Sequence, residues 1–259
     1  VNTTLADGKA TMTPSVFVKN HLSTPVQGTL RGNIGDICFE KEVILGANTE
    51  TEIVFSPEEY RQLAGQHMKL WWPNGYGKPH MYHAAYTFHS PQTKSVARME
   101  YRTGIRQVTY KDETTRLQLY INGQRFIPLG GNWGFSENHL NYRAREYDIA
   151  VGYHRQMNCT MIRNWVGQTG DEEFYEACDR HGIMIWQDFW LANPVDGPNP
   201  YDEAMFIANA EDYVRRMRSH ASIGLYCGRN EGFPPKVIDD ALRRIVRDEH
   251  PGLHYISSS

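Results

Sequence analysis

The chain has 259 residues, of which 40% are hydrophobic and 12% aromatic. This length and composition provide a sizeable core and favour two domains over one. The 27 basic and 30 acidic residues give a formal net charge of −3, and no basic run is long enough to follow a phosphate backbone or an anionic membrane surface. No apolar stretch approaches the roughly 20 residues that span a bilayer. We therefore expect neither a nucleic acid nor a membrane partner.

The amino terminus and the cysteines leave the cellular compartment open. No charged region followed by an apolar one begins the sequence, so the protein is either cytosolic or has lost its leader; for a bacterial source, the periplasm or secretion is favoured. We expect buried free thiols, with a disulfide between two of them still open, at Cys38, Cys159, Cys178 and Cys227. His80 and His83 have the spacing of a metal pair but no third ligand follows, so we predict no metal and no cofactor.

Short alternating runs separated by Gly, Pro and Asn fill residues 13–108. Val26, Leu30 and Ile34, for example, share one side of a strand, which leaves the other side for water. The pattern predicts strands at the intervals of a β-sandwich, at residues 15–20, 26–34, 38–45, 51–55, 68–72, 82–88 and 96–103. We assign residues 1–109 to this sandwich domain.

Beyond residue 110, strands alternate with amphipathic helices. A hairpin over residues 117–129 turns at Asn122-Gly123 and leads into a buried strand that ends near Gly130. Helices are predicted at 143–157, 171–180, 203–219 and from Pro235 onward, and strands at 159–165, 183–189, 222–230 and 254–259. This alternation indicates parallel strands, in an open sheet or a barrel. A (β/α)8 barrel needs roughly 250 residues, so residues 110–259 would hold only its first half. The junction at 109–113 is expected to be short.

The predicted strand ends carry an unusual number of tryptophans beside amides and charged groups. In parallel βα folds the reacting groups gather at these carboxyl ends. Flat aromatic faces pack on sugar rings, while amides and carboxylates bind hydroxyls, so the pattern favours a sugar site. The four ends are Gly130-Gly131-Asn132-Trp133, Arg163-Asn164-Trp165, Trp186-Gln187-Asp188-Phe189-Trp190 and Gly228-Arg229-Asn230-Glu231.

Glu231 is the most suggestive single residue. It follows an apolar strand and precedes a Gly-Phe-Pro-Pro turn, which places it at the top of the fourth strand. A partly buried carboxyl group there keeps a proton near neutral pH and can act as a general acid. The alternative is an ordinary surface glutamate, and spacing alone leaves the two open.

Several of these motifs, taken together and in order, resemble glycoside hydrolase family 2, and within it the β-mannosidase, endo-β-mannosidase and exo-β-glucosaminidase branch. The similarity runs from about Thr13 to the end of the chain. The matching motifs are Asn230-Glu231, Ile162-Arg163-Asn164-Trp165, His181-Gly182-Ile183 with Trp186-Gln187-Asp188-Phe189, Trp71-Trp72-Pro73-Asn74-Gly75-Tyr76-Gly77, Gly104-Ile105-Arg106 and Leu119-Tyr120-Ile121-Asn122-Gly123.

The resemblance implies a multidomain fold: an immunoglobulin-like β-sandwich followed by the first half of a (β/α)8 TIM barrel. It implies retaining hydrolysis of β-mannosides or related β-glycosides by double displacement, with Glu231 as acid/base. The family's nucleophile, on the seventh barrel strand, has no counterpart here, so we expect an internal segment that is inactive without the missing remainder of its polypeptide.

The same resemblance assigns the substrate-binding residues. Asn230 would bind the hydroxyl next to the anomeric carbon of an oligosaccharide or glycoside substrate, and Arg163 would support the missing nucleophile. The glycone subsite would be lined by Trp165, Trp186, Asp188, Asn132 and Trp133.

Three other interpretations remain open. If the chain were complete, Asp188 would have to be the nucleophile, whereas as a structural residue it would simply pair with Arg163. A non-catalytic carbohydrate-binding or interaction module would use the sandwich face instead. An enzyme that removes a proton beside a carbonyl would need a metal or a lysine at a strand end, and the sequence offers neither.

Overall fold

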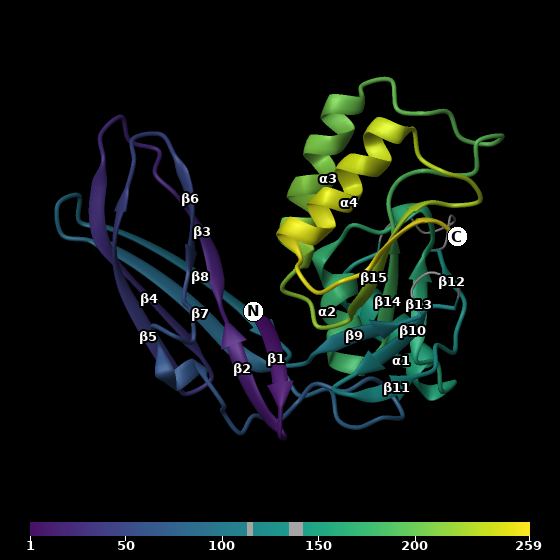
Figure 1. Ribbon diagram of the computed structural model, residues 1–259, viewed down its shortest axis with the longest axis horizontal. Coiled ribbons are helices and arrows are strands. Elements are labelled where there is room, and N and C mark those ends of the chain that lie inside the picture. The colour runs from purple at the N-terminus through teal and green to yellow at the C-terminus, as the bar shows by residue number, and fades with distance from the viewer. Residues whose placement is uncertain (113–115, 135–141) are drawn as a thin grey trace. The chain divides into compact units, whose positions relative to one another are not determined.

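The computed structural model describes residues 1–112, 116–134 and 142–259, and the chain divides into two compact units. Unit 1 comprises Val1–Lys69 and Met81–Ile105, and unit 2 comprises Leu70–His80 and Arg106–Ser259. The chain is rich in β-structure, and every α-helix among the described residues lies in unit 2 (Figure 1). The predicted division after residue 109 stays a prediction, and Glu113, the last residue of the predicted junction, lies outside the described residues.

Unit 1 is built of antiparallel strands. One sheet has the order β5-β4-β7-β8, formed by β4 (Val26–Ile34), β5 (Ile37–Leu45), β7 (Tyr82–Ser90) and β8 (Ser95–Thr103). Two further pairs join β3 (Ser15–Lys19) to β6 (Glu50–Val54) and β1 (Asn2–Ala6) to β2 (Lys9–Thr13). Alternate residues of β4 are buried, as the period of two requires. Rings from different strands meet in the core, where the centroids of Phe39 and Phe55 lie 4.6 Å apart.

The predicted strands of this region form within two residues of their expected bounds, with one exception. No strand forms at 68–72; Trp71 makes only an isolated bridge to Pro79, and the segment belongs to unit 2 from Leu70 onward. The sequence interpretation also missed β1 and β2, because these strands contain too many polar residues to show a clear apolar alternation. They form a hairpin that turns at Asp7 and Gly8. Both turn residues have positive φ, of 50° and 72°.

Unit 2 contains a five-stranded parallel sheet in the order β12-β13-β14-β15-β16. Its strands are β12 (Asn132–Trp133), β13 (Met161–Asn164), β14 (Met184–Asp188), β15 (Ile223–Arg229) and β16 (Tyr255–Ser258). The helices between them are α1 (Ala144–Gln156), α2 (Glu172–His181), α3 (Glu203–Met217) and α4 (Lys236–Glu249). The predicted hairpin forms as β10 (Gln118–Ile121) and β11 (Gln124–Phe126), and β9 (Val108–Lys111) completes a small antiparallel sheet with it.

Alternation along these strands separates the core from the candidate site. Ile162, Ile185 and Tyr226 are fully buried in one apolar cluster with helix residues such as Val151 and Leu242. The intervening positions point to the other face of the sheet, because successive side chains of a strand alternate. On that face Arg163 lies in register with Trp186, on the neighbouring strand.

The segment 71–74 caps the carboxyl ends of two helices, a role that sequence reasoning missed. The Asn74 side chain donates hydrogen bonds to the carbonyls of Arg155 (3.1 Å) and Cys159 (3.0 Å), at the end of α1. The Asn74 backbone N–H donates to Gly182 O (2.7 Å), just past α2. The Arg155 carbonyl also accepts the Asn158 backbone N–H (3.0 Å), so Asn74 adds a second donor there and supplies donors to the carbonyls of Cys159 and Gly182 just past the two helices.

Trp71 completes the same arrangement. Its side chain is fully buried, and its indole N–H donates to the carbonyl of Asp179 in the last turn of α2 (2.8 Å). Trp71 therefore packs inside unit 2 and offers no sugar-binding face.

A buried charged cluster ties α2 to the start of β15. His220, 4% exposed, contacts Asp179 through Nδ1 (2.7 Å) and Glu172 through Nε2 (2.8 Å). Burial alone would lower the pKa of His220, but the two carboxylates outweigh it and raise this pKa to about 10. Asp179 also accepts the Ser222 backbone N–H (2.8 Å), so the cluster holds the start of β15.

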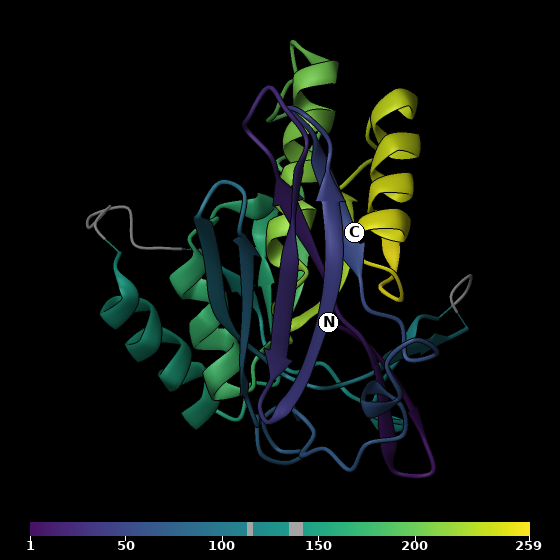
Figure 2. The ribbon, with the colours of Figure 1, turned by 90° about the vertical axis from the view of Figure 1, so that its left-hand side faces the viewer.

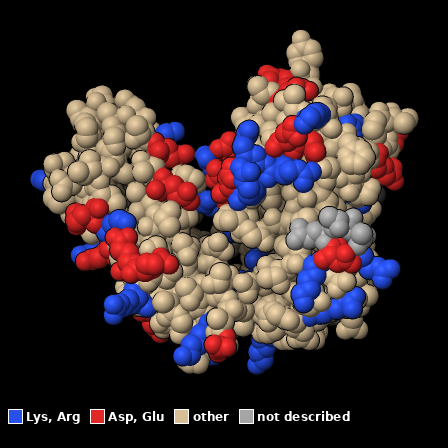
Figure 3. All heavy atoms as spheres, in the orientation of Figure 1, with Lys and Arg blue, Asp and Glu red and all other residues tan. Residues whose placement is uncertain are grey.

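Charges on the outer surface of unit 2 are mixed. Helices α3 and α4 lie side by side (Figures 1 and 2), joined by the ion pair between Arg215 and Glu249 (2.9 Å). Basic and acidic side chains are interspersed over these helices on the face drawn in Figure 3. Within the described ranges, no helix combines the length and apolarity needed to cross a membrane.

The expectation of buried thiols holds for only part of the set. All four cysteines are free; Cys178 and Cys227 are buried, and Cys159 is partly so. Cys38 is exposed, so the prediction was wrong there. It lies on β5, the edge strand of its sheet, at a position that alternates outward next to the buried Phe39.

Candidate active site

An ion pair between neighbouring strands forms the centre of the candidate site. Arg163 of β13 donates from Nη2 (2.7 Å) and Nε (3.0 Å) to Asp188 Oδ2 of β14. The Asp188 side chain is fully buried and that of Arg163 is 17% exposed. Burial raises the pKa of the Asp188 carboxyl group, and the adjacent guanidinium opposes that shift. The carboxylate therefore fixes one side of Arg163 while the other side stays accessible.

Asn230 joins this pair from β15. The Arg163 Nη2 donates to Asn230 Oδ1 (2.9 Å), and the Asn230 backbone N–H donates to Leu191 O (3.0 Å). With its oxygen so engaged, the amide is left with its two N–H donors, for which the described residues provide no partner. Such donors suit the hydroxyl of a sugar.

Glu231 follows directly and turns away from the strand. Its φ of 51° lies in the left-handed region, which is uncommon for a residue with a side chain. The expectation of a partly buried carboxyl group was wrong, because the Glu231 side chain is exposed and has no ion pair or hydrogen bond among the residues that the structure describes. Its backbone N–H approaches Ser259 Oγ (3.4 Å). The turn leaves this carboxyl group accessible to a substrate next to Asn230.

One tryptophan lies against the ion pair, and a second opens the turn that follows β13. The guanidinium of Arg163 lies over the Trp186 ring, 5.1 Å from its centroid. Trp165 opens the short turn Trp165–Gly167 (η2), in which Val166 has a φ of 46°, a strained value for a β-branched residue. The Val166 N–H donates to Asp188 Oδ2 (3.1 Å), so the same carboxylate that orients Arg163 also holds this turn.

The remaining predicted residues divide between the site and the core. Asn132 is exposed and lies in register with Arg163, beside the cluster. Trp133 is only 4% exposed and packs against Phe174, and its indole N–H donates to Thr169 Oγ1 (3.0 Å). As the next residue of its strand, it points to the helix side. The structure therefore does not bring Trp133 to the cluster.

Sequence reasoning missed Arg229, the residue before Asn230. It is 2% exposed, and its guanidinium donates to three oxygens of the loop that follows β14. The sequence did carry a signal, because an arginine at the end of an otherwise apolar strand must find buried partners. Among the described residues, no group of three or more His, Cys, Asp or Glu side chains is arranged to hold a metal ion.

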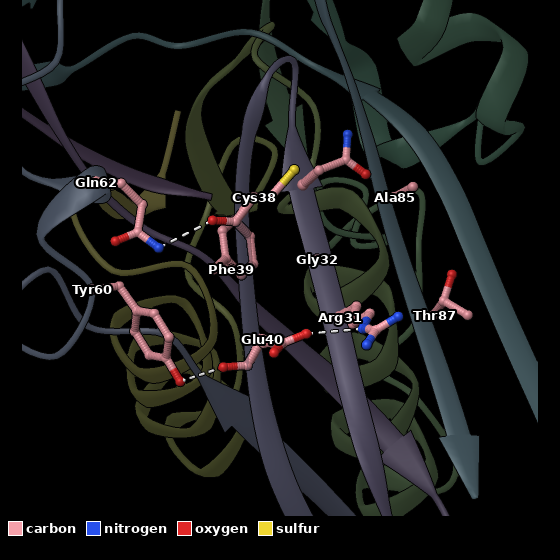
Figure 4. Close-up of a pocket in the computed structure, with 10 residues that line it drawn as sticks. Arg31, Gly32, Cys38, Phe39, Glu40, Tyr60, Gln62, Ala85 and Thr87 are labelled. Atoms are coloured by element: carbon pink, nitrogen blue, oxygen red, sulfur yellow. Dashed lines mark hydrogen bonds and ion pairs between the residues drawn. The ribbon is translucent and has the colours of Figure 1, made fainter.

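A pocket of about 440 Å³ lies in unit 1, on the outer side of the four-stranded sheet (Figure 4). Gln62 donates to Cys38 O (3.0 Å) and Tyr60 to Glu40 O (2.9 Å), both carbonyls of the edge strand β5. These two lining side chains thus already donate hydrogen bonds to the backbone, whereas the N–H groups of the Asn230 amide have no partner among the described residues.

The chain is similar in sequence to known glycoside hydrolases. Residues 1–106 match the family Glycosyl hydrolases family 2. The mannosylglycoprotein endo-beta-mannosidase of Lilium longiflorum is 37% identical over 189 residues, which cover 69% of this chain and 20% of the lily protein. The chain thus spans about a fifth of that curated relative.

Two solved structures share the fold over nearly the whole chain. The exo-chitosanase of Amycolatopsis orientalis superimposes with a TM-score of 0.83 at 19% identity, covering 99% of this chain and 31% of its own. The beta-D-mannosidase of Dictyoglomus thermophilum gives 0.77 at 22% identity, covering 99% and 34%. The family model and the lily relative support a fragment of glycoside hydrolase family 2, and the two solved structures show the fold.

Proposed function

We propose that this chain carries the acid/base half of a retaining β-glycoside hydrolase that acts on β-mannosides or related β-glycosides. Glu231 is the acid/base: it protonates the glycosidic oxygen as the leaving group departs and later removes a proton from the attacking water. Asn230 binds a hydroxyl beside the anomeric carbon, and Arg163 and Trp186 form the floor of the glycone subsite. Trp165 and Asn132 flank them.

The observation that carries this proposal is the shared network at the strand ends. Arg163 of β13, Asp188 of β14 and Asn230, the residue after β15, are linked by direct hydrogen bonds. The carboxyl group of the next residue, Glu231, has no partner among the described residues. The exposed Glu231 carboxyl group makes no bond to this network, which holds the preceding residue, Asn230. An acid/base must be held near the sugar while it exchanges its proton.

The same proposal explains the fold. Unit 1 is an immunoglobulin-like sandwich, and the five parallel strands of unit 2 begin a (β/α)8 barrel that further strands would close. We infer that the nucleophile belongs to a later part of the polypeptide and that the 259-residue chain alone is inactive. The share of the relatives that this chain covers, 20% of the lily protein, supports that inference.

The test requires the full-length parent protein and a series of alkyl β-glycosides and β-linked disaccharides, whose leaving groups must be protonated to depart. Glu231→Gln keeps the shape of the side chain but removes the exchangeable proton, so kcat/KM on the preferred glycoside should fall by about 100-fold to 10,000-fold. Glu176→Gln changes an exposed glutamate of α2 and serves as the matched control, with activity unchanged.

Either of two results would overturn the assignment. Wild-type activity that survives in Glu231→Gln would exclude Glu231 as acid/base. A parent protein that cleaves no glycoside, yet binds oligosaccharides, would favour the non-catalytic module, and the unit 1 pocket of Figure 4 would become its candidate site.

A further inference from the structure

Arg229 joins the strand that bears the acid/base to the loop after β14. Its Nε donates to Ala192 O (2.7 Å), its Nη1 to Asn199 Oδ1 (2.7 Å) and its Nη2 to Gly197 O (2.9 Å). All three acceptors are neutral oxygens of one loop, residues 191–199. No carboxylate of the described chain pairs with this buried guanidinium, so its contacts serve that loop alone.

The 191–199 loop is itself ordered by local hydrogen bonds. Asn193 Oδ1 accepts the backbone N–H groups of Val195 (3.0 Å) and Asp196 (2.8 Å), and Gly197 N–H donates to Asn193 O (2.9 Å). A Cβ on Gly197 would meet Ala192 Cβ at 2.9 Å, so the turn is also tightly packed. Arg229 thus anchors a rigid turn rather than a loose segment.

This loop touches the residue that follows the acid/base. A Cβ on Gly232 would meet Pro194 Cγ at 2.9 Å, so the two loops are in close contact, and Gly232, with a φ of 143°, has room for nothing larger than hydrogen. Asn230, on the other side of Glu231, is bonded to Leu191 at the loop's beginning. The loop that Arg229 anchors therefore holds the backbone before Glu231 by a hydrogen bond and packs closely against the residue after it.

The chemistry of the acid/base fixes what lies beside it. A general acid donates its proton to the oxygen between the sugar and the leaving group, so the leaving group departs next to the carboxyl of Glu231. A loop that contacts both neighbours of Glu231 borders that departure side. Its tip, Val195, is 94% exposed and free to contact the departing sugar.

We propose that Arg229 is a positioning residue: it fixes the 191–199 loop beside Glu231, and this loop forms the leaving-group side of the site, which binds the departing sugar of an oligosaccharide. The inference rests on the proposed function and adds a specificity determinant to it. The hydrogen bonds that the Arg229 guanidinium makes with described residues all go to the loop, and Arg229 acts through the placement of Glu231 and the loop.

The experiment compares two substrates on the full-length parent protein. A dinitrophenyl glycoside has a leaving group that departs without protonation, whereas a disaccharide needs both the proton and contacts for its departing sugar. Arg229→Lys keeps the charge but cannot make the same three hydrogen bonds. It should lower kcat/KM for the disaccharide at least about tenfold more than for the dinitrophenyl glycoside. The reason is that a misplacement of about 1 Å costs on the order of 100-fold in rate.

A second variant and a matched control protect the test against misfolding. Asn199 is exposed, so Asn199→Ala removes one acceptor without threatening the fold and should lower the same ratio about threefold. Arg247→Met, an exposed arginine paired only with its neighbour Asp248, should leave the ratio unchanged. Affinity for a monosaccharide lactam, which occupies the glycone subsite alone, should also stay the same in all variants.

An equal loss on both substrates in Arg229→Lys, or an unchanged ratio in Asn199→Ala, would reduce Arg229 to a structural residue and overturn the inference. If the wild-type parent cleaves neither substrate, the proposed function itself fails. That outcome differs from one in which both substrates are cleaved and the variants do not discriminate between them.

Discussion

Asn74 offers a sharp test of how unit 2 is held together. Its side chain donates to two carbonyls at the end of α1, and its backbone N–H donates to a third carbonyl just past α2. Asn74→Ala removes the two side-chain hydrogen bonds to Arg155 O and Cys159 O. Each neutral hydrogen bond contributes about 0.5 to 1.5 kcal/mol net, so we expect the free energy of unfolding to fall by about 1 to 3 kcal/mol. Asn74→Asp should cost more, because a carboxylate cannot donate and places a negative charge at the negative end of a helix.

The assay is urea denaturation of the 259-residue chain, followed by far-ultraviolet circular dichroism. Since every α-helix of the described chain lies in unit 2, the helical signal reports on that unit. Asn209→Ala, an exposed asparagine of α3, is the matched control and should shift stability by less than about 0.5 kcal/mol. If Asn74→Asp proves as stable as the wild type, the capping argument is refuted.

Two further predictions concern ionisable groups. His220 has its pKa raised to about 10, above an unfolded value of about 6.5, so its stabilisation is complete below about pH 6.5 and is lost as the pH rises through about 10. The free energy of unfolding that the helical signal reports should therefore fall by a few kcal/mol over that range, and it should fall less in His220→Gln. The same pH dependence in the wild type and the variant would contradict this. For the thiols, burial raises the pKa of Cys227 to about 12 and also raises that of Cys178, whereas Cys38 is exposed. Iodoacetamide should label Cys38 of the native chain at least about tenfold faster than the other two, as mass spectrometry of the peptides would show, and comparable rates would indicate that the core opens readily.

Strands and helices with a regular apolar period were predictable from the sequence. Val26, Leu30 and Ile34 defined β4 to the residue, and the period of α4 defined its buried face. The apolar run at 68–72 misled the same reasoning. Trp71 is buried because its indole caps a helix more than 100 positions away in the chain, at Asp179, and a local pattern carries no trace of such a contact.

The candidate site was predictable as a set of strand ends, because parallel strands bring their carboxyl ends to one edge. Side-chain direction was harder. Asn132 and Trp133 are adjacent, and a shift of one residue decides which of them faces the site and which faces the helices. Arg229 was overlooked because its partners are carbonyl and amide oxygens of a loop, which no charge pattern reveals.

The role of Glu231 can be measured most directly by azide rescue of Glu231→Ala in the full-length parent protein, with a dinitrophenyl β-mannoside. This leaving group departs without acid assistance, so the glycosyl-enzyme forms but water, lacking a base, attacks it slowly. Azide needs no base; it attacks the anomeric carbon, breaks the bond to the enzyme carboxylate and restores turnover. We predict faster turnover with azide and a β-glycosyl azide product. Turnover unaffected by azide, with no glycosyl azide formed, would contradict the assignment of Glu231 as the acid/base of a retaining glycosidase.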